Sequence, residues 1–171
     1  MDIRPILTAD QQLSQRIRIP LHRPVLRKAA ALFAHSADSW YWVAGLLTAW
    51  IAGPRDWRPL LVLLLASVIF TAVLVLALKF LIRRPRPEGP WGEVYRRSDP
   101  HSFPSGHAAR AALLTVLLGF AGPSWLIIPL LLWALGVNFA RIGLGVHYLS
   151  DVIGGTAIGV ILGCGLGIWW M

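Results

Sequence analysis

The chain has 171 residues, of which 56% are hydrophobic and only 14% are charged, and its mean hydropathy is +0.62. This composition is too apolar for an ordinary soluble domain of the same length, so it predicts an integral membrane protein. The formal net charge of +8 suits contact with anionic lipid. We expect a single membrane-embedded helical domain over residues 1–171.

Residues 1–38 are predicted to form two amphipathic helices that lie at the membrane interface. Thr8 and Gln11 have the spacing of a capping box, which predicts the start of a first helix that ends before Pro20. Pro24 is expected to open the second helix, because proline is tolerated in the first helical turn. Neither stretch is long or apolar enough to cross a bilayer.

Five apolar segments follow within residues 39–171, the predicted transmembrane core. They cover residues 39–52, 58–83, 105–120, 125–142 and 151–171. The uncharged runs in the second and fifth segments are about 20 residues long, which matches the ~30 Å hydrocarbon core of a bilayer. The expected fold class is therefore all-α, a polytopic bundle of about five transmembrane helices plus the N-terminal interfacial helices.

The alternation of five spans brings four helix ends to one membrane face, and that face collects most of the reactive polar side chains. They are Lys79, Arg83, Arg84, Arg86, Ser105, His107, Arg110, Arg141, His147 and Asp151. Lys79 and Arg86 are seven residues apart, so they would share a face if the helix continued that far. His147 and Asp151 would meet across one helical turn. Cations at the membrane border, together with histidines, suit binding and attack of a phosphate.

The stretch FPSGHAAR at residues 103–110 stands where the third span begins. Its proline and serine are typical of a helix start, with Ser105 as the cap. The free N–H groups of the same helix terminus would also bind an anion. Both interpretations can hold together, and the stretch is then a helix start that cradles a phosphate.

Three motifs within residues 79–151 resemble, in order and spacing, those of the type 2 phosphatidic acid phosphatase family. KFLIRRPRP from Lys79 is similar to the first motif, which is Lys, six residues, Arg-Pro. PSGH at residues 104–107 is similar to the second. ARIGLGVHYLSD from Ala140 is similar to the third, except that Ala140 stands where the family usually has serine. The five apolar segments also fit the helical core of this family.

The resemblance implies an integral membrane enzyme that hydrolyses a phosphate monoester or diphosphate of a membrane lipid. His147 would be the nucleophile that forms a phosphohistidine, and Asp151 would orient its ring. His107 would protonate the leaving oxygen and then activate water. The phosphoryl oxygens would be held by Lys79, Arg86, Ser105, Gly106 and Arg141.

No cofactor or metal is expected at this site, because several cations with one carboxylate are the reverse of what Mg²⁺ or Ca²⁺ prefers. A zinc site built from His101, His107 and His147 is an alternative, although positive charge crowds it. The expected partners are the lipid bilayer and a membrane lipid phosphate, and no nucleic acid.

Several lipids would suit a site at headgroup depth: a polyprenyl diphosphate, phosphatidylglycerol phosphate, phosphatidic acid and a phosphorylated glycolipid. A polyprenyl diphosphate or phosphoglycerolipid phosphate of a bacterial envelope is favoured. Two alternatives remain, a lipid phosphotransferase that uses the same phosphohistidine and a non-catalytic protein that binds anionic lipid. The resemblance predicts a multi-pass protein of the cell membrane with an extracytoplasmic site, whereas the excess of Arg and Lys on that side favours the opposite orientation.

Overall fold

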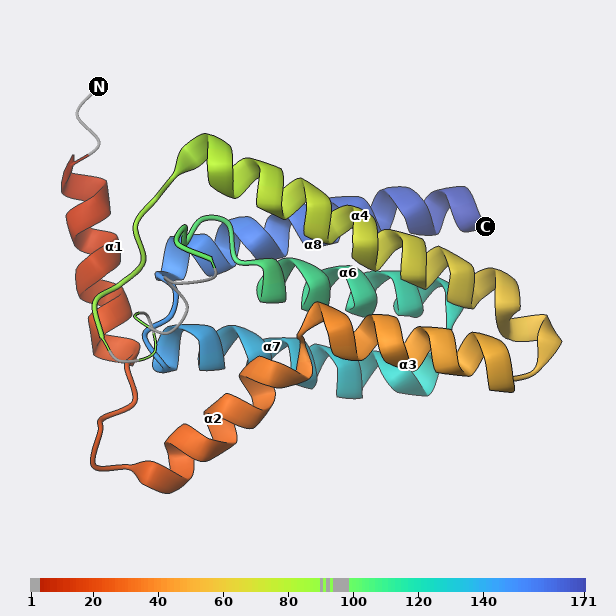
Figure 1. Cartoon of the computed structure of the whole chain (residues 1–171), viewed down its shortest axis with the longest axis horizontal. Helices are drawn as coiled ribbons and strands as arrows, with labels where there is room; N and C mark the ends of the chain where they lie inside the picture. Colours follow the sequence, from red (N-terminus) through yellow and green to blue (C-terminus); the bar gives the residue numbers. More distant parts are fainter. Residues whose placement is uncertain (1–3, 90, 92, 94–98) are drawn as a thin grey trace.

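The computed structural model describes residues 4–89, 91, 93 and 99–171, and these form a helical bundle (Figure 1). The helices of this part are α1 (Arg4–Ile17), α2 (Pro24–Ser36), α3 (Ser39–Ala52), α4 (Arg58–Ile82), α6 (Gly106–Ala121), α7 (Ile127–Gly143) and α8 (Leu149–Trp170). Short 3-10 turns precede α4 and α7, at Arg55–Trp57 and Ser124–Leu126. The described residues contain no β-strand, and the predicted all-α fold class is confirmed.

Five apolar helices, α3, α4, α6, α7 and α8, run lengthwise beside one another in Figure 1. Among the described residues, three helical segments are long and apolar enough to cross a membrane: Arg55–Ile82, Ser124–Gly143 and Leu149–Trp170. Helix α6 is apolar but has 16 residues, and α3 has 14. Both are shorter than the roughly 20 residues of a full crossing.

Helix α6 lies at the centre of the bundle and packs most closely against α8. Every fourth residue of α8 on this side is a glycine, from Gly155 to Gly167, and these glycines are buried. A Cβ added to Gly155 would lie 2.3 Å from the carbonyl oxygen of Ser105, and one added to Gly159 would lie 2.1 Å from that of Ala109. Small residues permit such close approach between membrane helices. The glycines therefore hold the start of α8 directly against the start of α6.

The two N-terminal helices take different courses. Helix α1 lies across one end of the bundle and contacts α7 and α8, whereas α2 packs along α7 (Figure 1). Pro24 opens α2 as predicted. The predicted start of the first helix at Thr8 is wrong, because the chain is already helical at Arg4. Proline in the first turn favours that earlier start, since Pro5 lacks an N–H that the helix would leave unpaired.

Helix α4 ends at Ile82, so Lys79 and Arg86 do not share a helical face, and this expectation is corrected. Arg83 adopts a left-handed conformation with φ 54°, and its N–H donates to the carbonyl of Lys79 at 2.8 Å. The following Pro85 cannot continue a helix. The chain instead turns across the end of the bundle, where Ser102 donates its N–H to the Arg84 carbonyl at 2.8 Å.

Candidate active site

The four helix ends predicted to share a face do meet at one end of the bundle. The guanidinium Nη1 of Arg86, after α4, lies 3.2 Å from Nε2 of His147, before α8. The N–H of Ser105, before α6, donates to the carbonyl of Asp151 at 2.9 Å. These contacts join segments 46 to 61 residues apart in the sequence, and they bring together residues from all three motifs.

The contact with Arg86 fixes the tautomer of His147. A guanidinium group only donates hydrogen bonds, so Nε2 of His147 accepts and Nδ1 carries the proton. Nδ1 lies 3.4 Å from Oδ2 of Asp151, an ion-pair distance without hydrogen-bond geometry. Catalytic hydrogen bonds are often this long before substrate binds. The predicted pairing of His147 with Asp151 is therefore present, with Asp151 in the first turn of α8 and His147 just before it.

Burial lowers the pKa of His147 well below its usual range, and the positive charges of Arg141, Arg86 and Lys79 lower it further. The ring is completely buried in the end of the bundle. His147 is therefore neutral at physiological pH, and its Nε2 can act as a nucleophile toward a phosphoryl group bound beside Arg86.

Asp151 is held by partners that the sequence did not reveal. Its Oδ2 accepts from the N–H of Tyr148 at 2.8 Å, and its Oδ1 accepts from Arg84 at 2.7 Å. Arg84 also donates to Asp10 of α1 at 2.6 Å, and Asp10 accepts from the N–H and hydroxyl of Ser150. Although burial raises the pKa of Asp10, the hydrogen bonds from Ser150 and Arg84 hold it below its usual value. Helix α1 is thus tied to the carboxylate beside His147.

The side chains of Lys79 and Arg86 converge on Asp99, a residue that the sequence analysis did not single out. Lys79 forms an ion pair with the Asp99 carboxylate, and Arg86 reaches the same oxygen at 2.7 Å through Nη2. Nε of Arg86 also donates to the Asp99 carbonyl at 2.7 Å. Both cations are buried. A carboxylate therefore lies where these two cations were predicted to hold phosphoryl oxygens.

The remaining predicted phosphate ligands are also at this end of the bundle. Ser105 caps α6, with its hydroxyl oxygen accepting from the N–H of Ala108, and Gly106 is the first helical residue. Arg141 is buried in the last turn of α7. Its neighbour Ala140 packs with small residues of α2 in a buried cluster. Alanine at position 140, in place of the serine usual in the family, therefore lies where α2 packs closely on α7.

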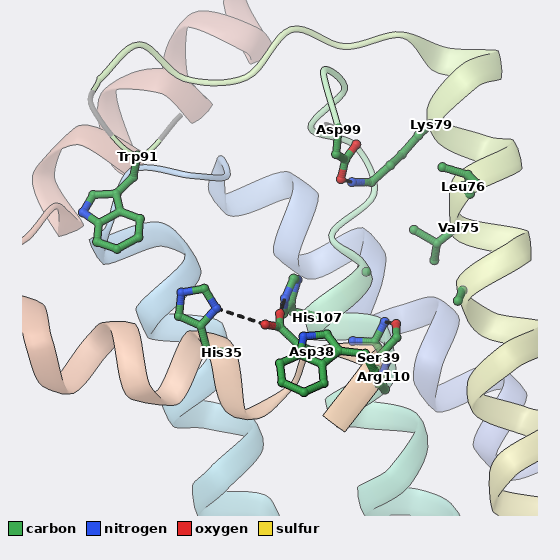
Figure 2. A pocket seen from close by; sticks show the side chains of 13 residues that line it. His35, Asp38, Ser39, Val75, Leu76, Lys79, Trp91, Asp99, His107 and Arg110 are labelled. Atoms are coloured by element: carbon green, nitrogen blue, oxygen red, sulfur yellow. Dashed lines mark hydrogen bonds and ion pairs between the residues drawn. The ribbon is translucent and has the colours of Figure 1, made fainter. Parts of the chain in front are cut away.

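Nε2–H of His107, in the first turn of α6, donates to the ionised Oδ1 of Asp38 at 2.5 Å. Asp38 lies between α2 and α3 and was also missed by the sequence analysis, because no motif marks it. Its second oxygen, Oδ2, lies 3.0 Å from Nδ1 of His35. Figure 2 shows His35 and His107 on either side of the Asp38 carboxylate.

A cavity of about 790 Å³ opens beside these groups (Figure 2). Lys79, Gly106 and His107, among the predicted site residues, line it, and so do Asp38 and Asp99. Its wall also includes apolar side chains of α3 and α4: Trp40, Ala72, Val75 and Leu76. The cavity thus joins a polar, charged region to an apolar one, as the phosphate and chain of a lipid would require.

The zinc alternative finds no support in the structure. Among the residues described, no three His, Cys, Asp or Glu side chains are grouped as the ligands of a metal would be. His101 instead packs edge-on against Phe80, with ring centroids 5.5 Å apart. The site is dominated by cations, which suit an anionic ligand.

A helical membrane bundle with histidines and cations gathered at one end is the arrangement of a membrane phosphatase. The chain belongs to the PAP2 superfamily, whose family model matches residues 60–171. It is 37% identical over 123 residues to the decaprenylphosphoryl-5-phosphoribose phosphatase of Mycobacterium tuberculosis, which covers 71% of this chain and 67% of that protein. It is 36% identical over 94 residues to the lipid A 4′-phosphatase of Bacteroides thetaiotaomicron, or 52% of this chain and 40% of that protein.

The fold is similar to the crystal structure of a PAP2-type phosphatidylglycerolphosphate phosphatase from Bacillus subtilis. The TM-score is 0.79 at 23% identity, over 96% of this chain and 86% of that chain. The comparisons confirm the family that the three motifs indicated. Because the family match begins at residue 60, α1, α2 and α3 lie outside it.

Proposed function

We propose that this protein is an integral membrane lipid phosphatase that hydrolyses a phosphate monoester or diphosphate of a membrane lipid through a phosphohistidine. The observation that carries the proposal is the buried His147, whose Nε2 lies 3.2 Å from Arg86 and whose pKa is lowered by burial and by the surrounding cations. A neutral imidazole nitrogen beside fixed positive charge is suited to attack phosphorus, because the charges stabilise the phosphoryl oxygens during transfer.

In the first half of the reaction, Nε2 of His147 attacks phosphorus and the bond from phosphorus to the leaving oxygen breaks. His107 gives its proton to that oxygen, and Asp151 stabilises the charge that appears on His147. Lys79, Arg86 and Arg141 hold the phosphoryl oxygens, together with the serine and the N–H of Gly106 from the PSGH motif.

In the second half, the neutral ring of His107 takes a proton from water while the water oxygen attacks phosphorus. The P–N bond to His147 then breaks and inorganic phosphate leaves. The proton taken from water restores His107 to its starting form, so one turnover consumes one water and needs no other reactant.

The cavity and the named relatives support a class of lipid substrate. The relatives act on phosphates attached to a decaprenyl-linked sugar and to lipid A. The apolar wall of the cavity, formed by Ala72, Val75 and Leu76 of α4, would accept the lipid chain. We therefore assign a polyprenyl-linked phosphate or diphosphate, or a phosphoglycerolipid phosphate, as the substrate class.

Trapping the phosphoenzyme tests the function. Rapid acid-free quench with ³²P-labelled lipid phosphate is expected to give an acid-labile, base-stable adduct that peptide mapping assigns to His147. His147→Ala should form none. His22→Ala, at an exposed histidine before α2, is the matched control and should form the adduct as the wild type does. An adduct on His107, or one that survives His147→Ala, would overturn the assignment of roles.

The two alternative functions separate by simple measurements. A lipid phosphotransferase passes the phosphoryl group to an acceptor lipid, so without an acceptor it would release no free phosphate, whereas a phosphatase releases phosphate with water alone. The non-catalytic alternative has lost its support, because the chain belongs to a family of phosphatases.

We further propose that 1–171 is one membrane domain in which α3, α4, α6, α7 and α8 cross the cell membrane, with α1 and α2 at the interface and the active site on the extracytoplasmic face. A cysteine introduced at Glu88, which is exposed near the site, should react with an impermeant maleimide in intact cells. A cysteine at Asp56, exposed at the opposite end, should react only after lysis. Both variants need Cys164→Ser, since Cys164 is the only native cysteine. The reverse pattern would refute the extracytoplasmic assignment.

A further inference from the structure

The carboxylate of Asp38 lies on the histidine that the proposed function uses as general acid. Oδ1 of Asp38 and Nε2 of His107 are 2.5 Å apart. Asp38 belongs to the connection between α2 and α3, 69 residues before His107 in the sequence and outside the region matched by the family model. Its contact with His107 resembles that of Asp151 with His147, so each histidine of the site faces one carboxylate.

The connection that carries Asp38 is fastened to α6 on both sides. Arg110, one turn after His107, donates to the carbonyl of Ala37 and to the hydroxyl of Ser39. These are the two residues that flank Asp38, and Ala37 is completely buried. His35 holds the second carboxylate oxygen at 3.0 Å. The carboxylate is thus fixed in position by three side chains rather than placed on a free loop (Figure 2).

The charges around His107 make an anion necessary if the ring is to carry a proton. Burial disfavours the imidazolium form of His107, and the positive charges of Arg141 in α7 and Arg110 in α6 disfavour it further. Asp38 is the anion that faces the ring. Although burial raises the pKa of Asp38, hydrogen bonds from His107 and His35 hold it at about 2. Asp38 therefore stays ionised throughout the physiological pH range.

We propose that Asp38 is the positioning residue of the general acid: its carboxylate holds Nε2–H of His107 and leaves Nδ1 to exchange the proton with the leaving oxygen and with water. This inference rests on the proposed function. In the first half-reaction Nδ1–H of the imidazolium moves to the leaving oxygen, and in the second Nδ1 takes a proton from water. In both half-reactions the Nε2–H bond of His107 stays intact and hydrogen-bonded to the Asp38 carboxylate. Asp38 itself therefore neither gains nor loses a proton.

The proposal extends the catalytic unit into the N-terminal segment, which is not part of the family match. Helices α2 and α3 then do more than cover α7 and α4, because their junction supplies a carboxylate to the reaction. An Asp38→Asn enzyme keeps a side chain of the same shape but loses the charge that supports the imidazolium. It should therefore behave as an enzyme with a weakened acid, not as one with a weakened nucleophile.

The test compares Asp38→Asn, His107→Ala and wild type, purified in the same detergent, on two substrates. An alkyl phosphate lipid needs a proton on its leaving oxygen, whereas nitrophenyl phosphate needs it far less. General acid help is worth about 10²–10⁴-fold, so the alkyl-to-aryl ratio of kcat should fall strongly in His107→Ala. In Asp38→Asn the alkyl-to-aryl ratio should fall about 10- to 100-fold, the usual loss when a residue that supports a reacting group is removed. The variant that combines Asp38→Asn with His107→Ala should have a ratio no lower than that of His107→Ala alone. Asp56→Asn, at the far end of the bundle, should keep the wild-type ratio.

A ratio of two rates on one preparation does not depend on how much of the enzyme is folded, so partial unfolding does not disturb it. If Asp38→Asn yields no folded enzyme, Asp38→Glu carries the same comparison, and its ratio should lie between wild type and His107→Ala. If Asp38→Asn or Asp38→Glu lost the same factor of kcat on the alkyl and the aryl phosphate while His107→Ala lowered the alkyl-to-aryl ratio, Asp38 would have only a structural role. That result would overturn the inference. If His107→Ala itself does not discriminate, the failure belongs to the proposed function, since His107 is then not the acid.

Discussion

Arg86 and His147 are joined by a 3.2 Å contact between Nη1 of the guanidinium and Nε2 of the imidazole. The guanidinium is fixed on its other edges, because Nε and Nη2 donate to Asp99 and Nη1 also donates to the carbonyl of Val146 at 3.1 Å. An arginine that binds a phosphoryl oxygen in this position would hold phosphorus next to the nucleophilic nitrogen. In the proposed mechanism, one side chain therefore both positions the phosphoryl group and selects the histidine tautomer.

Arg86→Lys is expected to lower kcat about 10²- to 10³-fold, the usual loss when one donor to a reacting oxyanion is removed. Lysine keeps the charge but has no planar fork, so it cannot donate to Asp99, Val146 and His147 together. Turnover of a lipid phosphate measures the effect. The matched control is Arg83→Lys, at an exposed arginine of the same loop, which should keep wild-type turnover. Equal turnover by Arg86→Lys and Arg83→Lys would contradict the proposed role of the Arg86 guanidinium.

The tautomer and charge of His147 are open to direct observation. Because burial and the neighbouring cations lower the pKa of His147 well below its usual range, its ring should stay neutral as the pH falls from 8 to 5. Nitrogen-15 NMR of histidine-labelled protein in detergent should show one ring with a protonated Nδ1 and a bare Nε2 over this range. The signal should disappear in His147→Ala. An imidazolium signal from His147 at pH 6, or a protonated Nε2, would contradict the structure of the site.

Asp99→Asn should strengthen inhibition by vanadate. The carboxylate of Asp99 pairs with Lys79 and Arg86 where phosphoryl oxygens are proposed to bind, so an anion must displace it. Because the Asp99 side chain is 33% exposed, water screens the pairs, and the gain should be about 0.5–1 kcal/mol, or roughly 2- to 5-fold in the inhibition constant. Glu88→Gln, at a nearby exposed acid, removes the same charge and should change the constant little. Weaker inhibition of Asp99→Asn would show that Asp99 supports the cations instead of competing for them.

Chelation is expected to leave activity unchanged. The proposed reaction uses two histidines, fixed cations and water, and it includes no step that a metal would perform. Prolonged treatment with EDTA should therefore preserve phosphate release, with a metal-dependent phosphatase assayed in the same buffer as the positive control for chelation. Loss of activity that Zn²⁺ or Mg²⁺ restores would refute this view of the site.

The sequence by itself determined the class of fold, the order of the helices and the family. Hydropathy and helix boundaries are local properties, so the apolar segments could be located within a few residues, as the end of the fourth helix near Ile82 illustrates. The three motifs carry His107, His147 and Asp151 in fixed order. Alternation of the spans was then enough to predict that these residues share one end of the bundle.

Only the tertiary structure decided which groups the proposed catalytic side chains touch. Asp38 reaches His107 across 69 residues, and Arg84 joins Asp10 across 74 residues, and no local pattern encodes such distances. The contacts of Arg110 with Ala37 and Ser39 hold Asp38 beside α6, and the left-handed turn at Arg83 precedes Arg84. The choice of carboxylate for each buried histidine or arginine therefore depends on how helices pack, because an ionised group in a membrane bundle is stabilised by the charges and hydrogen-bonding groups that packing brings beside it.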